Sequence, residues 1–184
     1  MICIRTLLFA AALTCGMALS SASHAVSYSA VQLGTLGGTG TYAYGINASG
    51  QVAGWSWMAG NTAGHAFITG ANGVGMTDLG TLGGANWSQA YDINASGQVV
   101  GRYLTTGNLA PHGFITGANG LGIRDLWSLG GTGTDAYGIN ASGQVVGGAT
   151  TVGNVQHAFI TGANGVGMTD LGTLGGTSSP KISR

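Results

Sequence analysis

The stretch INASGQV at residues 46–52 occurs again at residues 93–99 and at residues 139–145. The two offsets are 47 and 46 residues, so the chain repeats itself with a period of about 46 residues. Asn suits the first position of a tight turn, and Gly takes the left-handed conformation that closes the connection between two strands. Each copy of the stretch therefore predicts a β-hairpin turn, and the residues around it define one repeat.

Each repeat predicts four short antiparallel strands separated by turns. In the first repeat the expected strands are residues 42–46, 51–57, 65–69 and 75–82. The connection GANG at residues 70–73 contains Asn-Gly, which is a strong hairpin signal. Helix is not expected in the mature chain, because no stretch of 10 residues there both avoids glycine and keeps a 3.6-residue apolar period.

The third strand of the repeat has apolar or small side chains on both faces. Side chains alternate along a strand, so Phe67 points to one face while Ala66 and Ile68 point to the other. A sheet that is apolar on both faces must be covered on both, which stacking one repeat on the next achieves. Blades of β-propellers are four-stranded sheets with a similar period. The sequence predicts an all-β, propeller-like array of three four-stranded antiparallel blades over residues 26–178, followed by a tail at residues 179–184. Because closed propellers have about 4–8 blades, the array is expected to be incomplete or open.

Composition excludes several classes of protein. Charged residues make up 5% of the 184 residues and hydrophobic residues 44%, which is unlike a disordered chain. The 5 basic residues form no patch that could neutralise phosphates, so no nucleic-acid partner is expected.

Residues 1–25 have the three parts of a secretory signal peptide. Arg5 supplies a positive charge, residues 6–19 are almost wholly apolar, and residues 23–25 place small residues at a cleavage site. The apolar run is shorter than the roughly 20 residues that cross a bilayer as a helix. Both cysteines lie in this segment, so the expected mature chain from Val26 has neither a disulfide nor a membrane span. We expect a secreted, extracellular or cell-surface protein, with a periplasmic location left open.

The repeats also resemble a known family. The triplet His-Ala-Phe stands at residues 65–67 and 157–159, with Gly113 replacing the alanine in the middle copy. Together with DLGTLGG, at residues 78–84, and the pattern I-N-x-x-G-x-V-V-G, at residues 93–101 and 139–147, it resembles the HAF repeat family. The resemblance covers about residues 30–177. It implies a bacterial exported protein of tandem repeats with a propeller-like fold and no established activity.

Histidines and aspartates recur, but they do not predict catalysis or metal binding. A histidine opens the third strand of each repeat: His65, His112 and His157. Three imidazoles meeting at a common axis could bind Zn²⁺, but we expect each to bond a neighbouring backbone group instead. An aspartate precedes each Leu-Gly or Leu-Trp step: Asp78, Asp125 and Asp170. We expect these to accept turn amides, and we predict no catalytic residue, no metal and no cofactor.

Two windows of each repeat differ between copies, and these are the expected binding loops. Positions free to differ are expected to lie on exposed loops, where binding sites tend to occur. Their chemistry-bearing residues are Trp55, Trp57, Trp87, Arg102, Tyr103 and Asp135. Exposed Trp and Tyr rings stack on sugars or anchor protein partners. Ordinary drift of loop sequence is the alternative interpretation.

The sequence thus predicts an exported, non-enzymatic binding or scaffold module with a glycan or a protein as partner, and with self-association left open. One alternative is a carbohydrate-active propeller enzyme, which would need acids from different blades in one pocket. The other is a self-assembling matrix or amyloid-like polymer, since low charge and unpaired sheet edges favour association.

Overall fold

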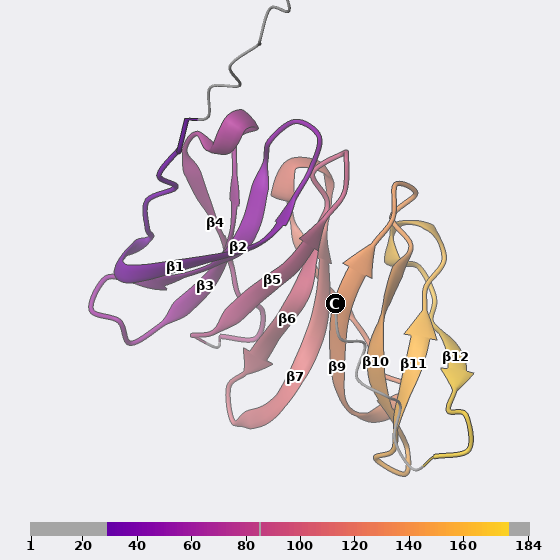
Figure 1. Ribbon diagram of the computed structural model, residues 1–184. Coiled ribbons are helices and arrows are strands. Elements are labelled where there is room, and N and C mark those ends of the chain that lie inside the picture. Colours follow the sequence, from indigo (N-terminus) through magenta and orange to yellow (C-terminus); the bar gives the residue numbers. More distant parts are fainter. Residues whose placement is uncertain (1–28, 85, 177–184) are drawn as a thin grey trace, which may run out of the picture. The chain divides into compact units, whose positions relative to one another are not determined.

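Three antiparallel sheets of four strands follow one another along residues 29–84 and 86–176, the part of the chain that the computed structural model describes (Figure 1). Sheet 1 contains β1 (Gly37–Ile46), β2 (Val52–Met58), β3 (Gly64–Thr69) and β4 (Met76–Gly80). Sheet 2 contains β5 (Ser88–Ile93), β6 (Val99–Thr105), β7 (Asn108–Thr116) and β8 (Ile123–Leu126). Sheet 3 contains β9 (Gly130–Ile139), β10 (Val145–Thr151), β11 (Gln156–Ile160) and β12 (Thr169–Gly172). Short 3-10 turns connect the third and fourth strands: η1 (Ala71–Gly73), η2 (Ala118–Gly120) and η3 (Ala163–Gly165).

The architecture confirms the predicted all-β array of four-stranded antiparallel repeats. Strands are hydrogen-bonded in sequence order within each sheet, and the arrangement is open rather than closed, consistent with an incomplete propeller. The sheets belong to one compact unit that starts at Val31. The predicted signal peptide (1–25) and tail (179–184) lie outside the described residues. Nowhere in the described ranges does a helix have the length and apolar character of a membrane span.

The INASGQV stretch forms the turn between the first two strands of every sheet. In sheet 1 the carbonyl of Asn47 accepts a hydrogen bond from the Gly50 amide at 2.9 Å, and Gly50 has φ of 72°. The Asn47 side-chain oxygen accepts the amides of Ser49 and Gln51 at 3.1 and 3.0 Å. The asparagine therefore satisfies the backbone of its own turn, as its sequence position predicts.

A glycine in the second strand of each sheet allows unusually close approach of the first strand. Gly54, Gly101 and Gly147 are equivalent, and a Cβ atom at these positions would lie 1.9, 2.0 and 1.9 Å from a carbonyl oxygen of the first strand. In sheet 1 the strand register shifts between Ala43 and Gly45, beside this contact. Any side chain would force the strands apart, which explains why every repeat has glycine here.

The sheets pack face to face through two equivalent apolar clusters. In the first cluster, Ala53, Ala66 and Ile68 of sheet 1 meet Ala90, Ile93, Val99, Tyr103 and Phe114 of sheet 2. In the second, Val100, Ile115 and Leu126 of sheet 2 meet Ala136, Val145, Ala149 and Phe159 of sheet 3. We call the side of a sheet that packs on the next sheet its forward face, and the opposite side its rear face. Sheet 2 is thus covered on both faces, as its two-sided apolar strands require.

The turn asparagines also connect one sheet to the next. The Asn47 Nδ2 atom donates to Gln51 Oε1 at 2.8 Å and to the carbonyl of Asn94 in sheet 2 at 3.0 Å. Asn94 repeats both bonds, to Gln98 Oε1 at 2.8 Å and to the carbonyl of Asn140 in sheet 3 at 3.0 Å. One side chain therefore ties together its own turn, its own second strand and the neighbouring turn.

Substituting Asn94 should destabilise the protein more than substituting Asn140. Asn94 is buried and bonded to the next sheet, whereas Asn140 is exposed and its amide bonds only Gln144 among the described residues. We expect Asn94→Ala to lower the free energy of unfolding by about 1–3 kcal/mol more than Asn140→Ala, because it leaves buried polar groups without partners. Denaturant unfolding of both variants measures the difference, and equal losses would contradict an inter-sheet role.

Candidate binding surface

Positions that differ between repeats come together because the sheets are stacked. One cross-strand position is occupied by Tyr42 and Trp55 in sheet 1, by Gln89 and Arg102 in sheet 2, and by Asp135 and Gly148 in sheet 3. Stacking places these pairs side by side, so their side chains and the aromatic rings around them form one surface. This aromatic–arginine patch consists of Tyr42, Tyr44, Trp55, Trp57, Trp87, Tyr91, Arg102, Asp135 and Tyr137.

Trp55 is the central ring of the part of the patch that joins sheets 1 and 2. It stacks on Tyr42 with ring centroids 4.8 Å apart and planes 13° apart. The edge of Trp57 lies against it at 5.1 Å, and Trp87 of the next repeat packs at 6.2 Å. The position equivalent to Trp87 is a glycine in the other repeats, Gly40 and Gly133, so this contact exists only at this sheet boundary.

Arg102 continues the patch from sheet 2 to sheet 3. Its guanidinium carbon lies 5.2 Å from the Trp87 ring centre and 5.7 Å from that of Tyr91. Its Nη1 atom pairs with Asp135 Oδ1 at 3.3 Å, and the Asp135 side chain is only 12% exposed. The Arg102 Nε atom is buried without a hydrogen-bond partner in the described structure. The guanidinium is therefore held on two rings and one carboxylate.

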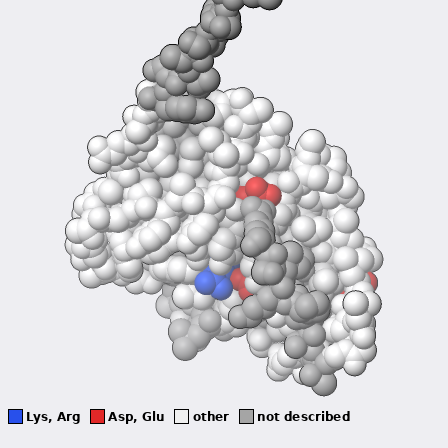
Figure 2. All heavy atoms as spheres, in the orientation of Figure 1, with Lys and Arg blue, Asp and Glu red and all other residues white. Residues whose placement is uncertain are grey.

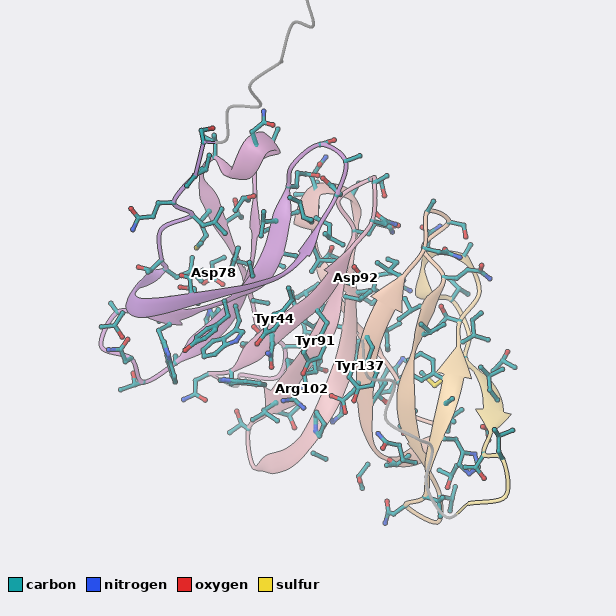
Figure 3. The ribbon with its side chains drawn as sticks, viewed as in Figure 1. Tyr44, Asp78, Tyr91, Asp92, Arg102 and Tyr137 are labelled. Atoms are coloured by element: carbon teal, nitrogen blue, oxygen red, sulfur yellow. The ribbon has the colours of Figure 1, made fainter. Side chains whose placement is uncertain are left out.

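Three equivalent tyrosines on the first strands form a row beside Arg102 (Figure 3). Tyr44 and Tyr91 have ring centroids 6.1 Å apart, and Tyr91 and Tyr137 lie 5.7 Å apart. Burial raises the pKa of Tyr91 well above its ordinary value. Burial also raises the pKa of Tyr137, and the hydrogen-bonded Asp135 carboxylate adds to the rise. The phenols of Tyr91 and Tyr137 are therefore neutral near pH 7.

A hollow of about 430 Å³ opens beside the patch. Its lining combines apolar groups with an amide and the guanidinium: Asn86, Trp87, Arg102, Leu104 and Pro111. Its size falls within the range of small-ligand sites, about 300–1,000 Å³. Figure 2 shows few charged groups on the visible face, and its blue atoms lie beside red ones. The charge of Arg102 is paired with the Asp135 carboxylate.

The expectation that the candidate residues lie on exposed loops was wrong for five of the six, which belong to strands. Trp55 and Trp57 belong to β2, Arg102 and Tyr103 to β6, and Asp135 to β9. Trp87, directly before β5, is half-buried.

Tyr103 does not belong to the patch, although the sequence grouped it with the other five residues. It is 3% exposed and lies in the apolar cluster between sheets 1 and 2. Burial raises its pKa to about 12, and the neighbouring Asp125, to which its hydroxyl hydrogen-bonds, adds to the rise. Its equivalents are Ser56 and Ala149, so the side chain replaces smaller groups in a core position.

The recurring histidines pair with the recurring aspartates rather than with backbone groups. The Nδ1 atoms of His65 and His157 lie 2.9 Å from carboxylate oxygens of Asp78 and Asp170, and the corresponding distance for His112 and Asp125 is 3.6 Å. Asp78 and Asp170 also accept turn amides as predicted, with Gly80 and Gly172 donating at 2.7 Å, whereas Asp125 Oδ1 is buried without a hydrogen-bond partner in the described structure. These amide and histidine bonds hold the pKa of Asp170 below its ordinary value. Each pair joins the third and fourth strands of its own sheet, and no group of three metal-ligating side chains occurs in the described ranges.

Sequence reasoning missed the tyrosine row and Asp92. The row had a signal, because Tyr44, Tyr91 and Tyr137 recur at equivalent positions. Asp92 replaces a glycine found in the other repeats, Gly45 and Gly138, and its Oδ2 accepts the Ile139 amide of sheet 3 at 3.0 Å. That bond crosses between sheets, so a single repeat gives no sign of it.

Arg102 and Asp135 should be energetically coupled. A double-mutant cycle with Arg102→Met and Asp135→Asn is expected to give a coupling free energy of about 1 kcal/mol, because the pair is only partly exposed. Arg102→Lys should restore less than half of it, since lysine keeps the charge but loses the planar stacking on Trp87. Chemical unfolding of the four cycle members measures the coupling, and a value indistinguishable from zero would contradict the pairing.

High pH should destabilise the fold through its buried phenols. The raised pKa of Tyr103, about 12 against 10.0, means that its favourable contribution is complete below pH 10 and is lost as pH rises through about 12. Absorbance titration of phenolate formation, with Tyr103→Phe as the matched control, should show a late-titrating group missing from the variant. A Tyr103 phenol that titrates at its ordinary value would contradict this prediction.

Comparison with known proteins identifies no relative from which a role could be transferred. No protein-family model matches the chain, and no curated protein matches its sequence. The function is therefore argued from the aromatic–arginine patch itself.

Proposed function

We propose that this protein is an exported, non-catalytic binding module and that its aromatic–arginine patch binds carbohydrate carrying a carboxylate group. The observation that carries the proposal is Arg102, which is fixed by two aromatic rings and Asp135 at the edge of a hollow of about 430 Å³. An arginine that lines the hollow suits a carboxylate ligand, because its planar guanidinium matches carboxylate geometry.

The lining of the hollow supports a sugar as the ligand. Trp87, Leu104 and Pro111 offer apolar surface for the C–H groups of a sugar ring, and Asn86 offers an amide for its hydroxyls. Tyr42 and Tyr44, at 50% and 47% exposure, extend the accessible aromatic surface beyond the hollow.

The chemistry of the acidic residues supports binding without catalysis. Glycoside hydrolysis commonly uses two carboxyl groups that differ in protonation. In the patch, Asp135 is bonded to Arg102 and Tyr137, and nearby Asp92 holds a backbone amide of sheet 3. Both carboxylates therefore already serve the joining of sheets 2 and 3.

The proposed location follows from the signal peptide expected at residues 1–25 and from the resemblance to the HAF repeat family. An exported repeat array of low charge suits contact with polysaccharide outside the cell, where an arginine among aromatic rings would select acidic over neutral sugars.

Binding should be visible in the fluorescence of the patch tryptophans. Trp127 lies outside the patch and is 78% exposed, so Trp127→Phe leaves the patch tryptophans as the signal. In this background, oligomers of a uronic acid should change the emission saturably, and neutral oligomers of the same length should bind more weakly. Arg102→Met should weaken binding about tenfold or more, because hydrogen bonds to charged groups contribute about 1.5–3 kcal/mol.

Trp87→Ala should abolish binding, while Trp127→Phe alone should match the unsubstituted protein in calorimetric titration. Equal affinity for acidic and neutral oligomers, or an Arg102→Met protein that binds acidic oligomers as tightly as its parent, would refute the proposed ligand class. Release of reducing sugar during the titration would instead favour the enzyme alternative.

A further inference from the structure

The forward faces of sheets 1 and 2 are each covered by the next sheet. The equivalent forward face of sheet 3 has no sheet packed on it in the described structure. Val146 and Leu171 are equivalent to Val100 and Leu126 of sheet 2. The sheet 2 residues are 0% and 3% exposed beneath sheet 3, whereas Val146 and Leu171 are 37% and 58% exposed. Leu174, which follows β12, is fully exposed.

The rear face of sheet 1 is the complementary outer surface, and a segment of the same chain covers part of it. Ile46 is 70% exposed, while its equivalent Ile93 is 5% exposed in the cluster between sheets 1 and 2. Ile93 shares that buried cluster with Ala53, which is the equivalent of Val146. Ile46, Val146 and Leu171 are therefore exposed at the two outer faces, whereas Val52 and Phe67 on the rear face of sheet 1 are buried, at 8% and 0% exposure.

The polar connection between sheets is also open at both outer faces. Asn47 and Asn94 each donate to the carbonyl of the next turn asparagine, but Asn140 makes no such bond within the described residues. Gln98 Nε2 likewise donates to Asn164 Oδ1 of sheet 3 at 3.2 Å. Its equivalent in sheet 3, Gln144, makes no such bond to another sheet in the described ranges. The side-chain amides of Asn140 and Gln144 in sheet 3 are therefore the donors of this connection. The turn of sheet 1 presents the matching acceptors at its rear face.

We propose that two copies of this chain associate head to tail, with the forward face of sheet 3 in each copy packed on the rear face of sheet 1 in the other. A contact between different surfaces closes into a ring when its rotation permits, and two copies give six sheets, within the 4–8 blades of closed propellers. The partner is a second copy because the docking surface continues interfaces that the chain already forms with itself. This inference does not depend on the binding proposal.

A segment before sheet 1 now occupies part of the docking site. Leu33 lies over Gly73 as Leu79 lies over Gly120 and Leu126 over Gly165. Thr41 donates to the Gly34 carbonyl at 2.7 Å, as Ser88 donates to the Gly80 carbonyl at 2.6 Å. Residues 31–36 thus imitate the end of a preceding repeat and cover the rear face of sheet 1.

Docking requires this segment to make room for β12 of the other copy. β12 is paired with β11 at Phe159–Asp170 and Ile160–Thr169, whereas residues 31–35 belong to no strand. Residues 31–35 lack strand hydrogen bonds, so they are displaced rather than β12. Leu33 and Leu171 occupy equivalent positions but have opposite effects on association. Leu33 favours the single chain, and Leu171 favours the pair.

The test is the molar mass of the expected mature chain, residues 26–184, by light scattering and native mass spectrometry. We expect a two-chain species that Ile46→Asp and Leu171→Asp convert to single chains. Val152→Asp is the matched control, because Val152 is 82% exposed on the turn after β10 and lies off the forward face. Leu33→Asp should shift the equilibrium toward the two-chain species.

Charge complementation adds an independent check. Ile46→Lys and Val146→Asp proteins should each be single chains, and mixing them should restore a two-chain species. A single-chain mass for both the parent and Leu33→Asp at every concentration tested would overturn the proposal. A pair that survives Ile46→Asp and Leu171→Asp would also overturn it, and an open-ended polymer would contradict the closed pair.

Discussion

A hydrogen bond from the side chain of one turn asparagine to the backbone carbonyl of the next sets the relation between neighbouring sheets. Asn47 and Asn94 make this bond with the same length, 3.0 Å, while also closing their own turns. Because a single amide serves both purposes, each turn is correctly placed only when the adjacent sheet is correctly placed. The apolar clusters and the aromatic–arginine patch both depend on this alignment.

Packing then compensates for an unusual composition. The chain has few charges and 37 glycines, which lose much conformational entropy on folding. Close strand approach at Gly54, Gly101 and Gly147 and coverage of sheet 2 on both faces use the absence of side chains to bring backbone and apolar surface together. Phe67, Phe114 and Phe159 are each 0% exposed, so every repeat contributes one fully buried ring.

Local sequence chemistry was enough to predict the strands and turns, because INASGQV and Asn-Gly act within a few residues. The stacking followed from strands with two apolar faces. Contacts between repeats were not predictable, because they depend on the register of one sheet against the next: the Asn94–Asn140 bond, the Arg102–Asp135 pair and the burial of Tyr103 all belong to this class. The His–Asp pairs were missed for a different reason, since a residue 13 positions away becomes a neighbour only after the third and fourth strands pair.

Because the repeats are nearly identical, their sheets could stack in the wrong order, and the aromatic–arginine patch distinguishes them. Residues 65–84 and 157–176 have the same sequence, so their strands alone cannot distinguish the first unit from the third. If sheet 3 took the place of sheet 2, Trp55 would face Gly133 in place of Trp87, and Arg102 would lose Asp135. The side chains that differ between repeats therefore distinguish the three sheets. Their contacts favour the arrangement in which sheet 2 lies between sheets 1 and 3.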